Sequence, residues 1–306
     1  MSLLVVGSVA FDALETPFGK VDRTLGGAAT YFSVAASFFT HVNLVGVVGE
    51  DFTRHDEAIF RGRRIDICGL ERAPGKTFFW AGRYGHDPNE RVTLATELNV
   101  FAAFRPKLPP GFRNSRHVFL ANIDPTLQRS VLEQIDGRPR MIGLDTMNYW
   151  IENTPAELRE ILRHTHVLMI NDAETRMLSN EHNLLRAARH IFSIGPRTLV
   201  IKRGEYGAMM VHSSGGKDGI FTVPAFPLEE VHDPTGAGDS FAGGFMGYLS
   251  ASRRITGGVL RRAMVYGSVM GSFAVERFGL ERLRRVKRRE IELRARHFAN
   301  LTRFRL

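Results

Sequence analysis

The amino-acid sequence predicts an α/β fold, a three-layer α/β/α sandwich built around a mostly parallel sheet. Short, continuously apolar segments of strand length alternate with helical segments along most of the 306 residues. Strands that are apolar on both sides are typical of a parallel sheet whose two faces are covered by helices. No internal repeat, low-complexity tract or long Pro/Gly/Ser linker divides the sequence, so we expect one domain over residues 1–306.

The elements of this fold follow from the apolar pattern. The candidate strands are Leu3–Val6, Leu44–Val48, His117–Ala121, Met141–Leu144, Val167–Ile170 and Leu199–Lys202. The candidate helices are Ala28–Phe39, Asp51–Arg61, Leu127–Gln134, Pro155–His164, Glu181–Phe192, Ser240–Ala251 and Thr256–Glu276. The N-terminal segment has only a short apolar run and no basic region before it, so we interpret it as the first strand rather than a signal peptide.

One region departs from the alternation. Thr77–Tyr84 and Arg91–Thr96 flank a turn at residues 86–90, a pattern that predicts a β-hairpin. With Phe11–Leu25, the hairpin would form a small β-sheet beside the main body, with strands from about 11–25 and 77–100. Phe78, Phe79 and Trp80 alternate across the first hairpin strand, so both faces carry apolar side chains and at least one face needs a partner. A surface hairpin without a role is the alternative.

Composition favours a cytoplasmic globular protein. Hydrophobic residues make up 43% of the chain and charged residues 24%, which is ordinary for a domain with a sizeable core. The single cysteine, Cys68, excludes an internal disulfide and suits a reducing compartment. No stretch approaches the ~20 apolar residues that cross a bilayer, so we expect no membrane contact.

The segment Asp233-Pro-Thr-Gly-Ala-Gly-Asp-Ser-Phe241 is the most informative in the chain. Gly236 and Gly238 flank Ala237 and permit a tight turn, and a buried helix follows. Free N–H groups at a helix start bind phosphate or a developing oxyanion. A carboxylate beside such a site, here Asp239, suits the deprotonation of a hydroxyl during phosphoryl transfer. Taken alone, an ordinary turn with Asp239 as a helix-capping acid fits equally well.

This segment resembles the C-terminal signature of the ribokinase/PfkB family of carbohydrate and nucleoside kinases. Three other motifs of the family lie upstream of this segment, in the order that the family has them. They are Gly26-Gly-Ala-Ala-Thr-Tyr31, Asn171-Asp-Ala-Glu174 and Lys202-Arg-Gly204-Glu-Tyr-Gly207-Ala208. The resemblance runs from about Leu3 to about Gly279. It implies a ribokinase-like fold in a single kinase domain, and an ATP- and Mg²⁺-dependent phosphotransferase with an alcohol group as acceptor. It also implies that the small sheet is a lid over the acceptor and often a homodimer surface.

The resemblance assigns roles around the catalytic segment. Asp239 would be the general base, and the backbone N–H groups of Gly236, Ala237 and Gly238 would stabilise the transferring phosphoryl group. Asp233 either caps the turn or helps to hold a monovalent cation, as in some relatives, and turn-capping is the stronger interpretation.

The Asn171–Glu174 pattern directly follows the strand that ends at Ile170, at the sheet edge where ligands bind. In the family it organises Mg²⁺, mainly through water, and Mg²⁺ bridges the ATP phosphates. The alternative is that Asn171 caps the following helix, with Glu174 in the first turn.

Nucleotide binding is expected at Lys202, Gly204, Thr235, Gly238 and Gly271. Gly204 would permit close approach of the phosphates to the backbone after a strand. Gly271 belongs to a helix of small residues that is similar to the wall of the family's adenine pocket.

On the acceptor side, Asp12, Gly26 and Gly27 match positions that bind sugar hydroxyls in relatives. Tyr31 stands where the ribokinase branch usually has Asn, so ribose is in doubt as the acceptor. Asn122, just after a strand, is a further candidate contact.

The leading function is therefore a sugar or sugar-like polyol kinase. The alternative within the family is a nucleoside kinase, favoured by Tyr31 and the aromatic residues of the hairpin. A distant alternative is a non-catalytic nucleic-acid-binding protein, suggested by the net charge of +9 and an arginine-rich C-terminal region. Glutamates and apolar residues interleave with those arginines, so a solvated amphipathic helix accounts for the region more simply.

Overall fold

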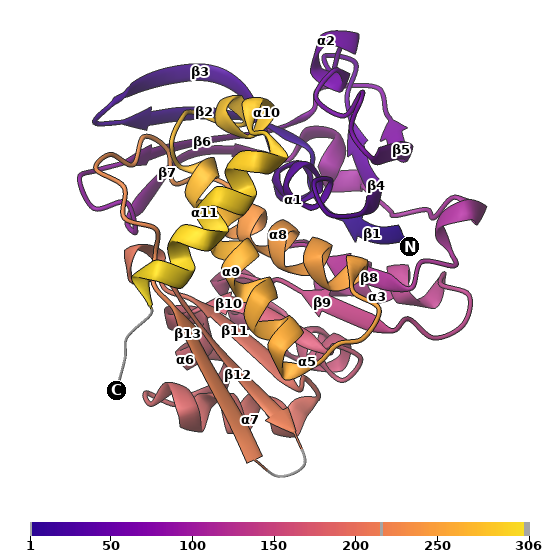
Figure 1. Cartoon of the computed structure of the whole chain (residues 1–306). Helices are drawn as coiled ribbons and strands as arrows, with labels where there is room; N and C mark the ends of the chain where they lie inside the picture. Colours follow the sequence, from indigo (N-terminus) through magenta and orange to yellow (C-terminus); the bar gives the residue numbers. More distant parts are fainter. Residues whose placement is uncertain (1, 215–216, 303–306) are drawn as a thin grey trace.

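The computed structural model describes residues 2–214 and 217–302 and contains two sheets (Figure 1). The larger sheet has nine strands, and its first, β1 (Ser2–Val6), lies between β8 and β4. In spatial order the strands are β13 (Lys217–Val223), β12 (Ala208–Ser214), β11 (Thr198–Lys202), β10 (Val167–Asn171), β9 (Met141–Leu144), β8 (His117–Leu120), β1, β4 (His41–Val48) and β5 (Ile65–Arg72). Neighbouring strands are parallel from β11 to β5, and only the β11–β12 and β12–β13 pairs are antiparallel.

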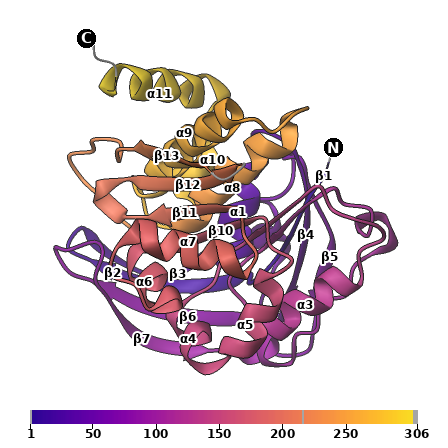
Figure 2. The same ribbon diagram turned by 90° about the horizontal axis from the view of Figure 1, so that it is seen from below.

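Helices cover both faces of this sheet and give the predicted three layers (Figure 2). One layer contains α1 (Ala28–Ala36), α8 (Ala237–Ala251), α9 (Gly257–Ala274), α10 (Glu281–Arg285) and α11 (Arg288–Leu301). The other contains α3 (Pro125–Glu133), α4 (Asn148–Asn153), α5 (Pro155–Leu162), α6 (Asp172–Ser179) and α7 (Leu184–Ile194). Short elements complete the chain: α2 (Arg54–Glu57) and the 3₁₀ turns η1 (Asn99–Ala103), η2 (Pro110–Phe112) and η3 (Gly204–Tyr206).

Strand β1 shows how the core is divided between the layers. Leu3 and Val5 pack into the cluster on the α1/α8/α9 side, whereas Leu4 and Val6 pack into the cluster on the α3/α5/α7 side. All four are fully buried. The continuous apolar run is thus explained by two covered faces, as the sequence predicts.

Helices α1 and α8 are in unusually close contact. A Cβ at Gly243 of α8 would overlap the backbone carbonyl of Phe32, and one at Gly247 would lie 3.0 Å from the Cα of Ala36. The glycines of α8 therefore let its backbone lie directly against α1.

The predicted helix over Asp51–Arg61 is wrong. Only Arg54–Glu57 is α-helical, because the Thr53 side chain and Asp56 form a capping box that begins the helix there. Phe52 and Phe60, which contribute to the apolar pattern, are core residues at the ends of a turn-rich connection. The sequence analysis also missed the edge strands β5 and β13 and the strand β12 next to β13, whose polar and apolar residues do not form a simple run.

The predicted small sheet is present. Its order is β3 (Gly19–Gly26), β2 (Ala10–Thr16), β6 (Phe78–Tyr84) and β7 (Arg91–Glu97). It lies to one side of the large sheet (Figure 1). The β2–β6 pair is parallel and the other two pairs are antiparallel, so the sheet is mixed. We call these four strands the lid sheet, after its expected role.

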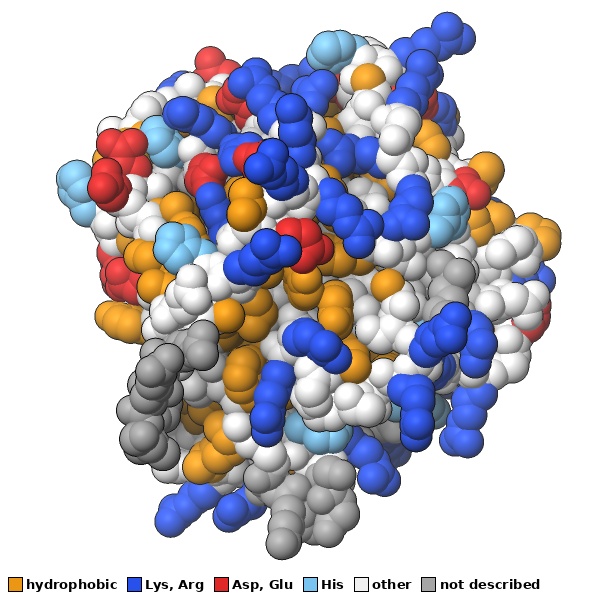
Figure 3. All heavy atoms as spheres, in the orientation of Figure 1, with side chains coloured by type: hydrophobic (Ala, Val, Ile, Leu, Met, Phe, Trp, Pro, Cys, Tyr) orange, Lys and Arg blue, Asp and Glu red, His pale blue; other side chains and the backbone are white. Residues whose placement is uncertain are grey.

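The arginine-rich C-terminal region folds as an amphipathic helix, as expected. Ile291 and Phe298 of α11 are buried, whereas Leu293 is 52% exposed. Arg282 bridges Glu276 and Glu290. Figure 3 shows many other basic side chains spread over this face. Among the described residues, no helix is both long and apolar enough to cross a bilayer.

Candidate active site

The predicted site residues gather at the carboxyl edge of the large sheet and at the start of α8. Asn122 follows β8, and Asn171 and Lys202 end the neighbouring strands β10 and β11, whereas Asp12 lies on β2 of the lid sheet, shortly after β1. Parallel strands present their carboxyl ends on one side, where ligands of open α/β sheets bind. The fold thus brings together residues that are far apart in the sequence.

The glycine turn has a demanding geometry at Gly236. This residue is the N-cap of α8 with φ +71°, and a Cβ there would overlap the ring of Tyr31. Gly238 lies inside the first helical turn without a positive φ, and its constraint is space, because a Cβ would lie 3.3 Å from Lys202 Nζ. The φ requirement therefore concerns Gly236 alone.

The N–H groups of the turn are not equivalent. The Ala237 N–H donates to the carbonyl of Pro234 at 3.2 Å. Within the described chain, the N–H groups of Gly236 and Gly238 have no recorded hydrogen-bond partner. These two donors, at the positive end of the α8 dipole, remain available to an anion.

Asp233 stabilises the turn through hydrogen bonds to backbone N–H groups. Its Oδ1 accepts from the Thr235 N–H at 2.9 Å, and its Oδ2 accepts from the Gly279 N–H at 2.8 Å. The side chain is fully buried. With both oxygens bound to backbone donors, Asp233 has the turn-capping geometry that was the stronger interpretation.

Asp239 stands in the first turn of α8, beside the free N–H groups. Burial of the carboxylate, together with the charge of Asp145, raises its pKa to about 6 against the opposing charges of Lys202 and Arg91. No hydrogen bond to this carboxylate is recorded among the described residues. An unengaged carboxylate with a pKa near neutrality matches the requirements of a general base.

Lys202 forms a buried ion pair that the sequence analysis missed. Its Nζ lies 2.8 Å from Oδ2 of Asp145, and their side chains are 20% and 6% exposed. Burial alone lowers the pKa of Lys202, but Asp145 and Glu174 more than offset this and keep the ammonium charged. Asp145 follows β9 directly, so its place at a strand end was the signal that could have identified it.

Asn171 and Glu174 form a complete capping box at the start of α6. Asn171 Oδ1 accepts from the Glu174 N–H at 2.7 Å, and Glu174 Oε2 accepts from the Asn171 N–H at 2.8 Å. Burial raises the pKa of Glu174, and the charge of Lys202 opposes that rise. The capping alternative is therefore realised, and it leaves the second carboxylate oxygen of Glu174 without a recorded bond.

On the acceptor side, Asp12 and Tyr31 are buried without polar partners. Asp12 is 4% exposed, and its carboxylate lies so close to Gly26 that any Cβ there would overlap it. Burial, together with repulsion from Asp233 and Asp239, raises the pKa of Asp12 to about 8. The Tyr31 hydroxyl is buried with no hydrogen-bond partner among the described residues.

The remaining acceptor-side candidates are placed by local contacts. Gly27 is the N-cap of α1 with φ +91°, and a Cβ there would lie 2.5 Å from the Ser8 carbonyl. Asn122 accepts a hydrogen bond from Trp150 Nε1 at 3.0 Å through its Oδ1, which leaves its NH₂ group free of that contact. Trp150, on α4, was not singled out from the sequence.

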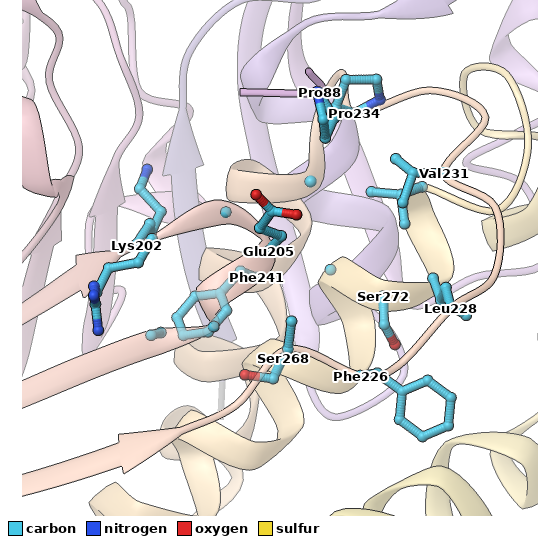
Figure 4. A pocket seen from close by; sticks show the side chains of 18 of the residues that line it. Pro88, Lys202, Glu205, Phe226, Leu228, Val231, Pro234, Phe241, Ser268 and Ser272 are labelled. Atoms are coloured by element: carbon cyan, nitrogen blue, oxygen red, sulfur yellow. The ribbon is translucent and has the colours of Figure 1, made fainter. Parts of the chain in front are cut away.

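A cavity of about 590 Å³ lies between the end of β11, α8 and α9 (Figure 4). Lys202, Gly204, Gly238 and Gly271 line it, as expected for nucleotide contacts. Thr235 is not part of its wall, because its hydroxyl donates to Tyr84 Oη on the lid sheet at 3.2 Å. The far wall is apolar and includes Phe226, Leu228 and Val231 (Figure 4), which suits a flat ring system.

Comparison with known proteins matches residues 2–284 to the family model described as pfkB family carbohydrate kinase. A cytidine kinase from Thermococcus kodakarensis is 29% identical, over 83% of this chain and 90% of that protein. An inositol 3-kinase from Arabidopsis thaliana is 26% identical, over 90% of this chain and 74% of that protein.

Solved structures show the same fold. Aminoimidazole riboside kinase from Salmonella enterica, solved with its riboside and an ATP analogue, superposes with a TM-score of 0.76 at 18% identity, over 96% of this chain and 100% of that chain. A ribokinase-type structure from E. coli that holds ATP and Mg²⁺ gives a TM-score of 0.79 at 19% identity, over 97% and 99% of the two chains.

Proposed function

The chain belongs to the PfkB family of carbohydrate kinases, and from that membership we propose that it transfers the γ-phosphoryl group of ATP to a hydroxyl of a sugar or sugar-like polyol. The observation that carries the proposal is Asp239, an unengaged carboxylate with its pKa raised to about 6, beside the free N–H groups of Gly236 and Gly238. These groups are what a hydroxyl acceptor and a transferring phosphoryl group require.

The residues divide the reaction between them. Asp239 takes the proton of the acceptor hydroxyl while that oxygen forms a bond to the γ-phosphorus and the bond to the β-phosphate oxygen breaks, releasing ADP. The N–H groups of Gly236 and Gly238 and the Lys202 ammonium stabilise the negative charge on the phosphoryl oxygens. Asp12 and the backbone at Gly26 and Gly27 orient the acceptor, and Asn122 supplies its free amide.

The residues around Glu174 fit a magnesium ion held mainly through water. Glu174, Asp145 and Asp239 form an acidic group opposed chiefly by Lys202 and Arg91. No cluster of acidic, His or Cys side chains that could hold a metal directly is found among the described residues. Mg²⁺ commonly keeps several waters and then needs few ligands from the protein. Mg²⁺ would neutralise phosphate charge there. Asp233 has both oxygens engaged, so we assign no monovalent cation to it.

A nucleoside is the second candidate acceptor, and one contact favours it. Register places Trp80 of β6 opposite Asp12 of β2, on the same face of the lid sheet. An indole beside the acceptor carboxylate provides a stacking surface for a base. The similarity to a cytidine kinase points the same way.

We also propose that the protein acts in the cytoplasm. ATP is present there, and the reducing environment suits a protein with a single cysteine. A homodimer through the lid sheet is a further proposal, supported by the exposed Val92 and Leu94 on β7, which are 59% and 50% exposed. Light scattering would test this proposal by measuring the molar mass of the parent and of the double variant Val92→Lys, Leu94→Lys. We expect a dimer for the parent and a monomer for the variant.

The decisive experiment is a phosphorylation screen of sugars, polyols and nucleosides with ATP and Mg²⁺, with ADP release and product mass as readouts. Asp239→Asn serves as the matched blank. Phosphorylation of one class only would identify the acceptor. Absence of any product from folded, ATP-binding protein would overturn the proposed function.

A further inference from the structure

The turn of the β6–β7 hairpin reaches the nucleotide cavity. Pro88 and Asn89 line that cavity together with Lys202, Gly204 and Pro234 (Figure 4). The Asn89 side chain lies directly over Gly204, because a Cβ at Gly204 would overlap its Oδ1. Asp87 Oδ1 accepts from both the N–H and the Nδ2 of Asn89, which fixes the turn. The hairpin therefore spans from the acceptor side to the donor side.

Strand register shows which residues of the hairpin face the catalytic turn. Tyr84 pairs with Arg91 across the hairpin, so both project from the same face. Tyr84 is 8% exposed, and its Oη accepts from Thr235, the residue before Gly236. The Arg91 guanidinium carbon lies 5.6 Å from the ring centroid of Trp80, which pairs with Asp12 on this face.

Arg83, on the same hairpin, has the opposite placement. It is the neighbour of Tyr84 in β6 and therefore projects from the other face. Its Nε lies 3.0 Å from Glu15 Oε1, so its charge is paired on the outside of the lid sheet. The hairpin thus offers two arginines in comparable exposed positions, one facing the site and one facing away.

Arg91 has no carboxylate partner recorded within residues 2–214 and 217–302. Its charge nevertheless acts on the site, because it lowers the pKa of Asp239 against the larger effect of burial. An unpaired guanidinium on the face of the hairpin that meets the catalytic turn through Tyr84 and Thr235 is the type of group that stabilises the oxygens of a transferring phosphoryl group.

We propose that Arg91 is a catalytic residue that donates hydrogen bonds to the transferring γ-phosphoryl group, opposite the N–H groups of Gly236 and Gly238. This inference rests on the proposed function. The lid sheet then does more than cover the acceptor, because its closure also completes the charge stabilisation around the phosphoryl group. No bond changes other than those of the proposed transfer are involved.

Steady-state kinetics of Arg91→Ala, Arg91→Lys and the matched control Arg83→Ala test the proposal. We expect Arg91→Ala to lower kcat by about 10²-fold, in line with the loss of one preorganised donor. Arg91→Lys should recover part of that loss, and Arg83→Ala should stay within about twofold of the parent. Millimolar guanidinium ion should partly restore Arg91→Ala, which a merely structural role would not predict.

A binding measurement separates this inference from the proposed function. Calorimetry with ADP, Mg²⁺ and aluminium fluoride, which mimics the transferring phosphoryl group, needs no acceptor. We expect Arg91→Ala to bind this combination at least tenfold more weakly than the parent, with the affinity for ADP alone unchanged. If Arg91→Ala matches Arg83→Ala in both kcat and this affinity, Arg91 does not contact the phosphoryl group. Arg91→Ala could instead bind the aluminium fluoride combination more weakly while the parent phosphorylates none of the acceptors tested. That result would support the contact between Arg91 and the phosphoryl group and overturn only the proposed acceptor.

Discussion

The donor half of the site and its acceptor half differ in how their charges are satisfied. On the donor side, Lys202 pairs with Asp145, Glu174 pairs with the Asn171 N–H, and Asp233 binds two backbone donors. On the acceptor side, the Asp12 carboxylate and the Tyr31 hydroxyl are buried with no recorded hydrogen-bond partner among the described residues.

This difference indicates which half of the site gains hydrogen bonds when its substrate binds. Groups that are already paired need no rearrangement when a nucleotide enters, so the donor half is preorganised. Buried groups without partners destabilise the protein until a ligand supplies the missing hydrogen bonds. We therefore expect the acceptor half to hold the groups that select the acceptor, and the hydroxyl groups of the acceptor to supply the hydrogen bonds that Asp12 lacks.

Substitution at the junction of the two halves should have the largest effect. Asp239→Asn keeps the shape of the side chain but cannot take a proton, so we expect kcat to fall ~10²–10⁴-fold. ATP affinity, measured by calorimetry, should be nearly unchanged because the donor half is intact. Near-parental turnover on the cognate acceptor would remove Asp239 from the mechanism.

The same residue sets the expected pH dependence. A base with its pKa raised to about 6 is active when deprotonated. For the parent enzyme, kcat/KM should therefore fall about tenfold per pH unit below about pH 6 and level off above it. A flat profile between pH 5 and 7 would contradict the assignment.

The lid sheet allows a comparison of two neighbouring rings. Trp80 faces the acceptor side with Asp12, whereas Phe79 packs against the main core and Phe78 stacks on Phe101 at 5.4 Å. Trp80→Ala should raise KM for the acceptor by an amount equivalent to ~1–3 kcal/mol if a base stacks there, and should increase ATP hydrolysis without acceptor.

Phe79→Ala is the matched control for Trp80→Ala. It should lower the free energy of unfolding by roughly 2 kcal/mol, less than for a fully buried ring, and leave KM unchanged. An equal loss of sugar and nucleoside binding in Trp80→Ala would indicate a general lid. If neither truncation alters KM, hydrolysis or stability, the hairpin is not a lid.

Asp12 tests whether the acceptor half is indeed strained. With a pKa of about 8 in the folded state against an ordinary value of 3.8, the native protein binds more protons than the unfolded chain between about pH 4 and 8. Stability therefore decreases as pH rises through that window. Asp12→Asn removes the group, so its stability gain over the parent should grow with pH through that window, by at most ~1.4 kcal/mol per pH unit. Urea unfolding at pH 5 and pH 8 measures this, and a gain that does not grow with pH would show that Asp12 is not strained.

Glu174→Gln should have the smallest effect and addresses the donor half. The amide oxygen can still accept from the Asn171 N–H, so α6 and the melting temperature should be preserved. Loss of the charge should raise the Mg²⁺ concentration for half-maximal activity by several-fold. An unchanged magnesium titration would favour a purely structural capping role.

Local sequence patterns predicted the parallel sheet and the capping and turn motifs of the donor half. They did not predict the contacts between residues that are distant in the sequence. The parallel sheet follows from continuous apolar strands, and the Asn171–Glu174 box and the turn at Gly236 are encoded within a few residues. The partner of Lys202 is 57 residues away, and Thr235 meets Tyr84 across 151 residues. No periodicity or spacing specifies such pairs, because they depend on how the sheets are placed in space. The pairing of Asp145 with Lys202 and the position of Arg91 opposite Tyr84 therefore became visible only in the structure.

The close contact between α1 and α8 constrains how this enzyme can diverge. Gly26 and Gly27 lead into α1, Asp239 stands on α8, and the glycines of α8 bring the two backbones together. Grafting α1 from a relative with another acceptor would place foreign side chains against Gly243 and Gly247, and the displaced α8 would carry Asp239 with it. A successful exchange would have to include residues 26–36 and 236–251 together. If these residues have the roles proposed for them, acceptor choice and the position of Asp239 cannot be changed independently, and we expect laboratory recombination to succeed only when both segments are exchanged.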